Sequence, residues 1–375
     1  MRERAYMAAY FLAHAVYQNY MSLYYRALGF GGARLGILGV LTAAASAPGQ
    51  MLFGALADRT GQTARVLRVL LGVAAALLLL LTRVRAFAAA AVFAGLLGFF
   101  YAPVQPLGDA LVLERLSRAQ KPFGPVRLMG ALAFALSALL FGFFLNAAGR
   151  ETLVALCAAG LMALALAASL LLRGRSRSRA KARPLRLLAD PRVRRMLLFA
   201  LPSQITMGYF YTFYPTHFME VPGATAALLG WSNLISALAE IPFLLLGDRV
   251  YRRFGAAPVI AAASAALGVR WLLVGLASSP AALLASQVLH GVGYIAVALS
   301  MALFLNEVAP EHLRASGQAL FGCASFGVAR VVGNALGALA AARVGEAGGF
   351  VCCAALCLLC AAAFLPLRRR GLCIL

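Results

Sequence analysis

Apolar runs of about 20 residues follow one another along almost the whole chain, separated by short polar connections. A helix needs roughly 20 apolar residues to cross the hydrocarbon core of a bilayer, so each run predicts one membrane-spanning helix. The predicted spans are residues 6–27, 35–56, 67–83, 86–112, 127–148, 152–172, 196–218, 227–247, 258–278, 282–305, 316–342 and 350–366. Six spans therefore precede a break, and six follow it.

The break is a basic segment, residues 173–195, with ten Lys and Arg residues and a single aspartate. We expect it to be a cytoplasmic linker between two halves, and its Leu185, Leu187 and Leu188 could form a short helix on anionic lipid headgroups. The pattern predicts an all-α integral membrane protein with twelve transmembrane helices as two six-helix bundles around a central cavity. The predicted parts are a bundle over 1–172, the linker over 173–195 and a bundle over 196–375.

The composition agrees with a membrane protein: 63% of the residues are hydrophobic and 12% are charged. The mean hydropathy of +0.85 lies outside the usual range for soluble domains. The net charge of +22 could also indicate a nucleic-acid partner. On the predicted topology, however, about 25 Lys and Arg lie on the side of the termini and about six on the other side. The positive-inside rule then places both termini in the cytoplasm, and we expect no nucleic-acid partner.

Ionisable side chains lie inside or at the edge of several predicted spans, where an unpaired charge costs several kcal/mol. These residues are Asp109, Arg127, Glu240, Arg270, His290 and Arg330. Charged residues at such positions are typical of a protein that moves a solute or an ion.

The two halves also resemble each other. Pro48 is followed by Gly54, Asp58, Arg59 and Gly61, and Pro242 is followed by Gly247, Asp248 and Arg249. Internal duplication of a six-helix unit is typical of transporters that alternate access to a site between the repeats.

Residues 54–62 read Gly-Ala-Leu-Ala-Asp-Arg-Thr-Gly-Gln and resemble the loop motif G-x-x-x-D-R-x-G-R of the major facilitator superfamily, except at Gln62. The resemblance implies the major facilitator fold and a gating role for Gly54, Asp58, Arg59 and Gly61. The alternative is a solvated turn.

A narrower resemblance covers most of the chain. Residues 102–109 (Ala-Pro-Val-Gln-Pro-Leu-Gly-Asp) and 127–130 (Arg-Leu-Met-Gly) are similar to the branch that contains lactose permease, phenylpropionate permeases and nucleoside symporters; residues 240–243, 269–271 and 289–291 extend the similarity. In that branch the residues matching Asp109 and Arg127 form a substrate-linked ion pair. Those matching Glu240, Arg270 and His290 belong to the binding and proton-coupling network. The branch implies the inner (plasma) membrane of a bacterium.

Spacing supports both groups independently of the resemblance. Asp109 and Arg127 lie at similar depth in consecutive antiparallel spans, so they could bind substrate or form a permanent salt bridge. Glu240 shares a helical face with Asn233 and Ser236, which suits a cavity wall, although it could instead pair structurally with Arg270. His290 lies on a stripe with Gln287 and Tyr294, either as a proton relay or as hydrogen-bonded packing.

Two departures from the sugar permease pattern bear on the substrate. Gly293 stands where that permease has a coupling carboxylate, and Phe134 stands where it has a tryptophan that stacks on the sugar. Galactoside specificity is therefore not expected, and proton coupling would fall on Glu240 or Asp109. The further candidate substrate-binding residues are His14, Gln18, Gln105, Asn233, Arg330 and Asn334. Intramembrane arginines outnumber the acids, which favours an anionic substrate.

We therefore expect a monomeric, proton-coupled secondary transporter that imports a small organic solute: a sugar, a nucleoside or an aryl carboxylate. The alternatives are a drug or metabolite exporter and a non-transporting membrane sensor or scaffold. The expected partners are substrate, protons and membrane lipids. No enzyme activity is expected, because the four His residues have no clear Ser or Cys partner. No G-x-x-x-x-G-K-[ST] motif occurs, so ATP-driven pumping is not supported. No cofactor is expected, and no metal site either, because the cysteines that share a helical face, Cys353, Cys357 and Cys360, have no His or acidic partner nearby.

Overall fold

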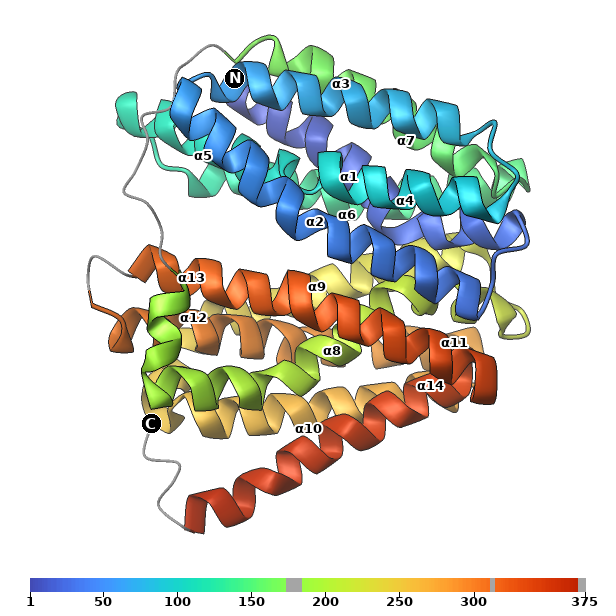
Figure 1. Cartoon of the computed structure of the whole chain (residues 1–375). Coiled ribbons are helices and arrows are strands. Elements are labelled where there is room, and N and C mark those ends of the chain that lie inside the picture. Colours follow the sequence, from blue (N-terminus) through green and yellow to red (C-terminus); the bar gives the residue numbers. More distant parts are fainter. Residues whose placement is uncertain (173–183, 311–313, 370–375) are drawn as a thin grey trace. The chain divides into compact units, whose positions relative to one another are not determined.

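Helices form all the regular structure in the computed structural model, which describes residues 1–172, 184–310 and 314–369. Two compact units divide the chain: Met1–Ala180 with Thr225–Trp231, and Lys181–Ala224 with Ser232–Leu375. The helices of unit 1 are α1 (Arg2–Ala27), α2 (Ala33–Thr60), α3 (Thr63–Leu81), α4 (Phe87–Tyr101), α5 (Val104–Arg118), α6 (Gly124–Ala148) and α7 (Leu153–Ser169). Within this unit α1 packs on α6 and α7, α2 on α4, and α3 on α7 (Figure 1).

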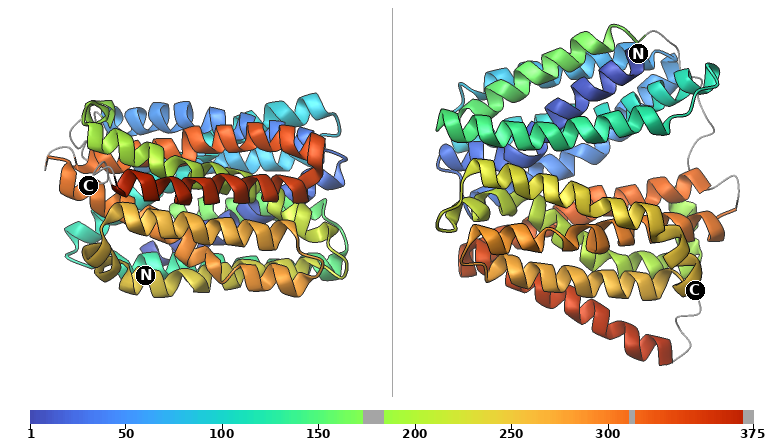
Figure 2. Two further views of the ribbon diagram at one scale, coloured as in Figure 1. Left: turned by 90° about the horizontal axis from the view of Figure 1, so that it is seen from below. Right: turned by 180° about the vertical axis from the view of Figure 1, so that it is seen from behind.

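Unit 2 contains the other helices that the structure describes, except that α9 belongs to unit 1 up to Trp231. Three of these described helices are short and of a type other than α. The full set is η1 (Pro184–Ala189), α8 (Pro191–Glu220), α9 (Ala226–Phe254), α10 (Ala256–Gly275), α11 (Pro280–Ser286), η2 (Gly291–Ile295), α12 (Ala296–Val308), α13 (Arg314–Gly322), η4 (Cys323–Ala329) and α14 (Arg330–Arg369). The segments η2 and η4 are π-helical. Helix α14 packs on α10 and α8 (Figures 1 and 2).

Eight helical stretches in the described residues are long and apolar enough to cross a membrane. Several element ends differ from the sequence prediction. The span expected at 86–112 is broken between α4 and α5, where Pro103 lies and a proline removes a helical hydrogen bond. The spans expected at 316–342 and 350–366 are joined in α14, which is interrupted only by Gly345 in a left-handed conformation (φ 74°).

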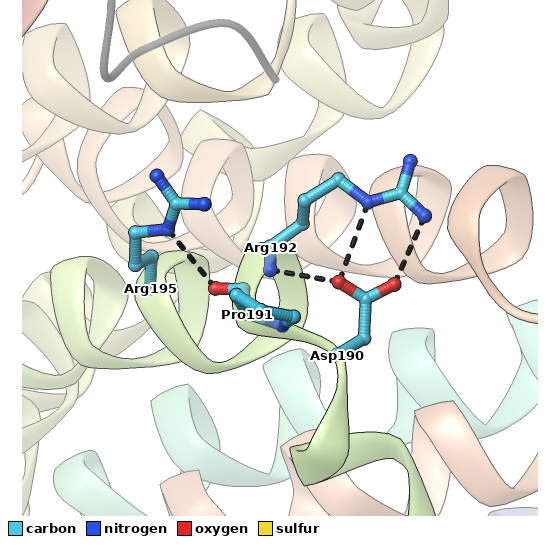
Figure 3. A network of polar contacts seen from close by, with 4 residues as sticks. All are labelled: Asp190, Pro191, Arg192 and Arg195. Atoms are coloured by element: carbon cyan, nitrogen blue, oxygen red, sulfur yellow. Dashed lines mark hydrogen bonds and ion pairs between the residues drawn. The ribbon is translucent and has the colours of Figure 1, made fainter.

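Helix α8 begins at Pro191, within the residues predicted as the linker. Asp190 caps this helix: its carboxylate accepts the backbone N–H of Arg192 at 2.8 Å and its guanidinium at 2.9 Å (Figure 3). The Arg192 side chain also holds the pKa of Asp190 below its usual value. Proline at the first helical position fits this start. Residues 173–183 of the linker lie outside the described ranges, and Leu187 of η1 is buried in a cluster with Val193 and Met196.

Helices α2 and α4 approach so closely at Gly98 that a β-carbon there would overlap the backbone carbonyl of Thr42. Gly95, three residues earlier on the same helix, has no atom within 4 Å of such a β-carbon. We expect Gly98→Ala to lower the free energy of unfolding by about 1–3 kcal/mol through overpacking. Gly95→Ala should be neutral or stabilising by up to about 1 kcal/mol, because alanine is the better helix former. Denaturant unfolding in detergent measures both, and equal stability of the two variants would contradict this helix contact.

Candidate functional site

An acid and an imidazole meet inside unit 2. The Nε2 atom of His290 lies 3.2 Å from Oε1 of Glu240, and the two side chains expose 6% and 27% of their surface. Glu240 comes from α9, and His290 directly precedes the π-helical turn η2. The backbones approach closely here, because a β-carbon at Gly291 would overlap the carbonyl oxygen of Ala239. The absence of a side chain at Gly291 therefore allows α9 to come close enough for this pair to form.

Gln287 connects the neighbouring polar side chains. Its Oε1 accepts hydrogen bonds from Arg270 Nη2 at 2.6 Å and from Ser236 Oγ at 2.7 Å. Its Nε2 donates to the Tyr214 hydroxyl at 2.7 Å, and that hydroxyl lies 2.6 Å from Ser232 Oγ. The polar stripes expected on α9 and around His290 therefore contact each other.

Arg270 is fully buried on α10. Its guanidinium carbon lies 4.4 Å from the ring centre of Phe210 and 4.6 Å from that of Trp271. Glu240 pairs with His290, and among the described residues no carboxylate lies within ion-pair distance of Arg270. The structural pairing of Glu240 with Arg270, left open by the sequence, is therefore not formed in this structure.

Arg330 and Asn334 lie in the first turns of α14, directly after the π-helical turn η4. The Arg330 guanidinium lies over the ring of Tyr211 at 4.6 Å. The Asn334 amide donates to the backbone oxygen of Arg330 at 2.8 Å, and its own oxygen is buried without a hydrogen-bond partner among the described residues. Asn233 on α9 likewise has a buried amide nitrogen for which the residues at 1–172, 184–310 and 314–369 supply no partner.

Aromatic side chains surround His14 in unit 1. His14 Nδ1 lies 2.6 Å from the Tyr101 hydroxyl, and the rings of Tyr101 and Tyr17 meet edge to face at 4.6 Å. The ring of Phe134 lies 5.8 Å from that of His14. These rings could contact a planar or cyclic ligand by stacking.

The charges of Asp109 and Arg127 also lie in unit 1, on α5 and α6, close enough to attract each other. Both side chains are half-buried, yet they are not within ion-pair distance, because the Arg127 guanidinium lies over the ring of Phe11 at 4.4 Å. The permanent salt bridge is thus not formed in this structure. Gln105, one helical turn before Asp109, and Gln18 on α1 are half-buried as well.

Comparison with known proteins identifies the family of this chain. The model of the MFS_1 like family matches residues 4–347, which is most of the chain. The chain belongs to the MFS_1 like family. This protein is accordingly a multi-pass membrane protein of a transporter family, as the resemblance of its motifs implied.

Several relatives of this MFS_1 like protein carry transporter names. A maltose permease of Geobacillus stearothermophilus is 27% identical over 320 residues, which cover 84% of this chain and 78% of the relative. A probable 3-phenylpropionic acid transporter of Escherichia coli (strain K12) is 25% identical over 291 residues, 75% of each chain. The crystal structure of the nucleoside transporter NupG superposes with a TM-score of 0.86 at 18% identity, covering 97% of this chain and 98% of NupG.

The gating motif of the MFS_1 like protein lies at the end of α2. Asp58 and Arg59 are exposed, and Gly61 ends the helix in a left-handed conformation (φ 63°), which favours glycine. This backbone conformation explains why the second glycine of the motif, Gly61, is a glycine. The gating role itself stays a prediction.

Two polar residues of this MFS_1 like protein were not among the candidates from the sequence. Gln287 had a usable signal, because it precedes His290 by one helical turn. Tyr101 had none: its partner His14 lies 87 positions away, and no local spacing predicts such a contact.

Proposed function

We propose that this MFS_1 like protein is a proton-coupled secondary transporter that imports a small organic solute by alternating access. The observation that best supports it is the contact of Glu240 with His290 inside an apolar helical bundle. Two titratable groups at hydrogen-bond distance can take up and release a proton, and in membranes such pairs commonly form proton relays. The solute would be a sugar, a nucleoside or an aryl carboxylate.

Each unit offers candidate contacts for the substrate. In unit 1 the aromatic rings around His14 would stack on a ring, while Asp109 and Arg127 would hydrogen-bond its polar groups. Because these two charges lie close without pairing, each keeps capacity for a ligand. The remaining proposed contacts are Gln18, Gln105, Phe134, Asn233, Arg270, Arg330 and Asn334.

The proposed architecture has twelve spans in two six-helix bundles. The eight apolar stretches include α14, which would supply two spans divided at Gly345. Helices α1, α7 and α8 supply the others. The shorter α7 is apolar, and α1 and α8 carry more polar residues than a simple hydropathy criterion allows. We further propose a monomer in the bacterial inner membrane with both termini in the cytoplasm, as the charge distribution predicts.

Purified protein in liposomes is expected to accumulate a substrate when the exterior is made acidic relative to the interior. Maltose, uridine and 3-phenylpropionate, as radiolabelled probes, represent the three solute classes. Accumulation above protein-free liposomes that disappears with a protonophore would support proton-coupled import. Accumulation in the interior only when the interior is the acidic side would favour an exporter. Absence of flux for every probe, together with absence of binding, would favour a sensor or scaffold.

A further inference from the structure

Two arginines in the helical segments of unit 2 form no ion pair among the described residues. Arg270 and Arg330 lie in apolar helical segments, and Glu240 contacts His290. Among the residues that the structure describes, no carboxylate lies within ion-pair distance of either arginine. A buried guanidinium without a counter-ion is costly, and a transporter can recover that cost when the counter-ion is its substrate.

Arg270 has more hydrogen-bond capacity than the protein uses. A guanidinium carries five N–H donors, and the one hydrogen bond that Arg270 forms with the described residues runs from Nη2 to Gln287. Nε and Nη1 are buried and have no acceptor in the part of the chain that the structure describes. Since Nη2 has a second hydrogen, one complete edge of the guanidinium, with two nitrogens, stays open. Each unsatisfied buried donor is destabilising.

We propose that the open edge of Arg270 binds the carboxylate of an organic acid, which makes a small monocarboxylate the substrate class. This inference rests on the proposed transport function and narrows it. A carboxylate matches the open edge because it accepts two parallel hydrogen bonds and neutralises the charge. A sugar hydroxyl or a nucleobase carbonyl accepts hydrogen bonds but leaves the charge unbalanced.

The surroundings of Arg270 suit the apolar part of such an acid. The rings of Phe210 and Trp271 cover the guanidinium, and Phe210 also packs against Tyr211 and Tyr214. Aromatic walls bind an aryl or alkyl group while the arginine binds the carboxylate. Arg270 has no exposed surface in this structure, so the acid reaches it when the aromatic cover opens, as alternating access requires.

The charge of the substrate also determines the charge moved in each cycle. A monocarboxylate that enters with one proton on Glu240 and His290 transfers no net charge. A neutral solute entering with one proton would transfer one positive charge. Uptake of the acid should therefore respond to the pH gradient and not to the membrane potential.

Binding by matched acid and amide pairs tests the carboxylate directly. We expect 3-phenylpropionate and benzoate to bind the wild-type protein at least about 30-fold more tightly than 3-phenylpropanamide and benzamide. Arg270→Gln should weaken binding of the acids by at least about 30-fold and of the amides by less than about threefold. Arg343→Gln, at an exposed arginine of α14, provides a control for removing one arginine and should leave the affinities for acids and amides unchanged. Equal affinity for acid and amide, or unchanged acid affinity in folded Arg270→Gln, would overturn the proposal.

Arg270→Lys covers the case in which Arg270→Gln does not fold. It keeps the charge and loses the two-nitrogen edge, so the acids should bind about tenfold more weakly; unchanged affinity would overturn the two-nitrogen contact. Uptake is also measured while valinomycin and potassium hold the membrane potential constant, and uptake by protein-free liposomes is subtracted. This measurement distinguishes failure of the carboxylate inference from failure of the proposed transport. Proton-driven uptake of maltose or uridine without binding of any acid overturns the inference and leaves proton-coupled import standing. Acid binding without proton-driven uptake overturns proton-coupled import and leaves the carboxylate inference standing.

Discussion

Uptake driven by a pH gradient is expected to fall to the protein-free background when Glu240 is replaced by glutamine. Glutamine nearly preserves the size of the side chain and a hydrogen bond to His290, but it cannot exchange a proton. Exchange of labelled for unlabelled substrate across the membrane needs no net proton movement, so it should persist in Glu240→Gln. Both rates are measured with the same proteoliposomes.

Glu220→Gln is the matched control, because this glutamate is exposed at the end of α8 in the same unit. It should leave uptake unchanged. If Glu240→Gln still concentrates substrate against its gradient, the proton is carried elsewhere, and Asp109 becomes the next carboxylate to test.

Gly291→Val is expected to cause the largest loss of stability. A β-carbon at this position overlaps the Ala239 carbonyl and the backbone of Glu240, so valine must push α9 away. The cost should reach about 3 kcal/mol or more. Because the displaced backbone carries Glu240, its contact with His290 should also be lost, and any folded fraction should lack proton-driven uptake. Unfolding in detergent and uptake in liposomes measure the two effects.

Gly327→Val is a close control for this change, since Gly327 lies in the other π-helical turn and has no neighbour within 4 Å of an added β-carbon. Gly327→Val should lower the free energy of unfolding far less than Gly291→Val. Similar losses in both variants would mean that valine disrupts the π-helical turn itself and that the contact with α9 is not the cause.

The sequence predicted those features of the candidate site that depend on the free-energy cost of a charge inside the membrane and on spacing along one helix. Charged residues in apolar runs are too costly to be incidental, so Glu240 and His290 could be named, and helical spacing joined each to its polar stripe. Which stripe faces which depends on how helices pack, and spacing alone could not pair Glu240 with His290 rather than with Arg270. The resemblance to a known branch placed Glu240, Arg270 and His290 in one group but did not say which two of them are in contact.

Unit 1 shows more clearly that contacts between side chains of different helices could not be predicted from the sequence. The depth of Asp109 and Arg127 was predicted from their distance to a short connection, but side-chain direction was not. Phe11, more than a hundred positions from Arg127, offers a ring face that competes for the guanidinium. The π-helical turns beside His290 and Arg330 were also not predicted, because an extra residue in a helical turn leaves no periodic signal in apolar sequence.

The amide of Gln287 has a fixed direction. Its oxygen accepts from Arg270 and Ser236 while its nitrogen donates to Tyr214. The two hydroxyls could bond either orientation of the amide, but a guanidinium only donates, so turning the amide over would break the hydrogen bond with Arg270. An amide also does not titrate near neutral pH. The arginine side of the network thus keeps its geometry whether or not His290 carries a proton. On the proposed scheme, solute selectivity and energy coupling are chemically separable: substitutions around Arg270 could change which solute is accepted while the protonation chemistry of Glu240 and His290 is retained.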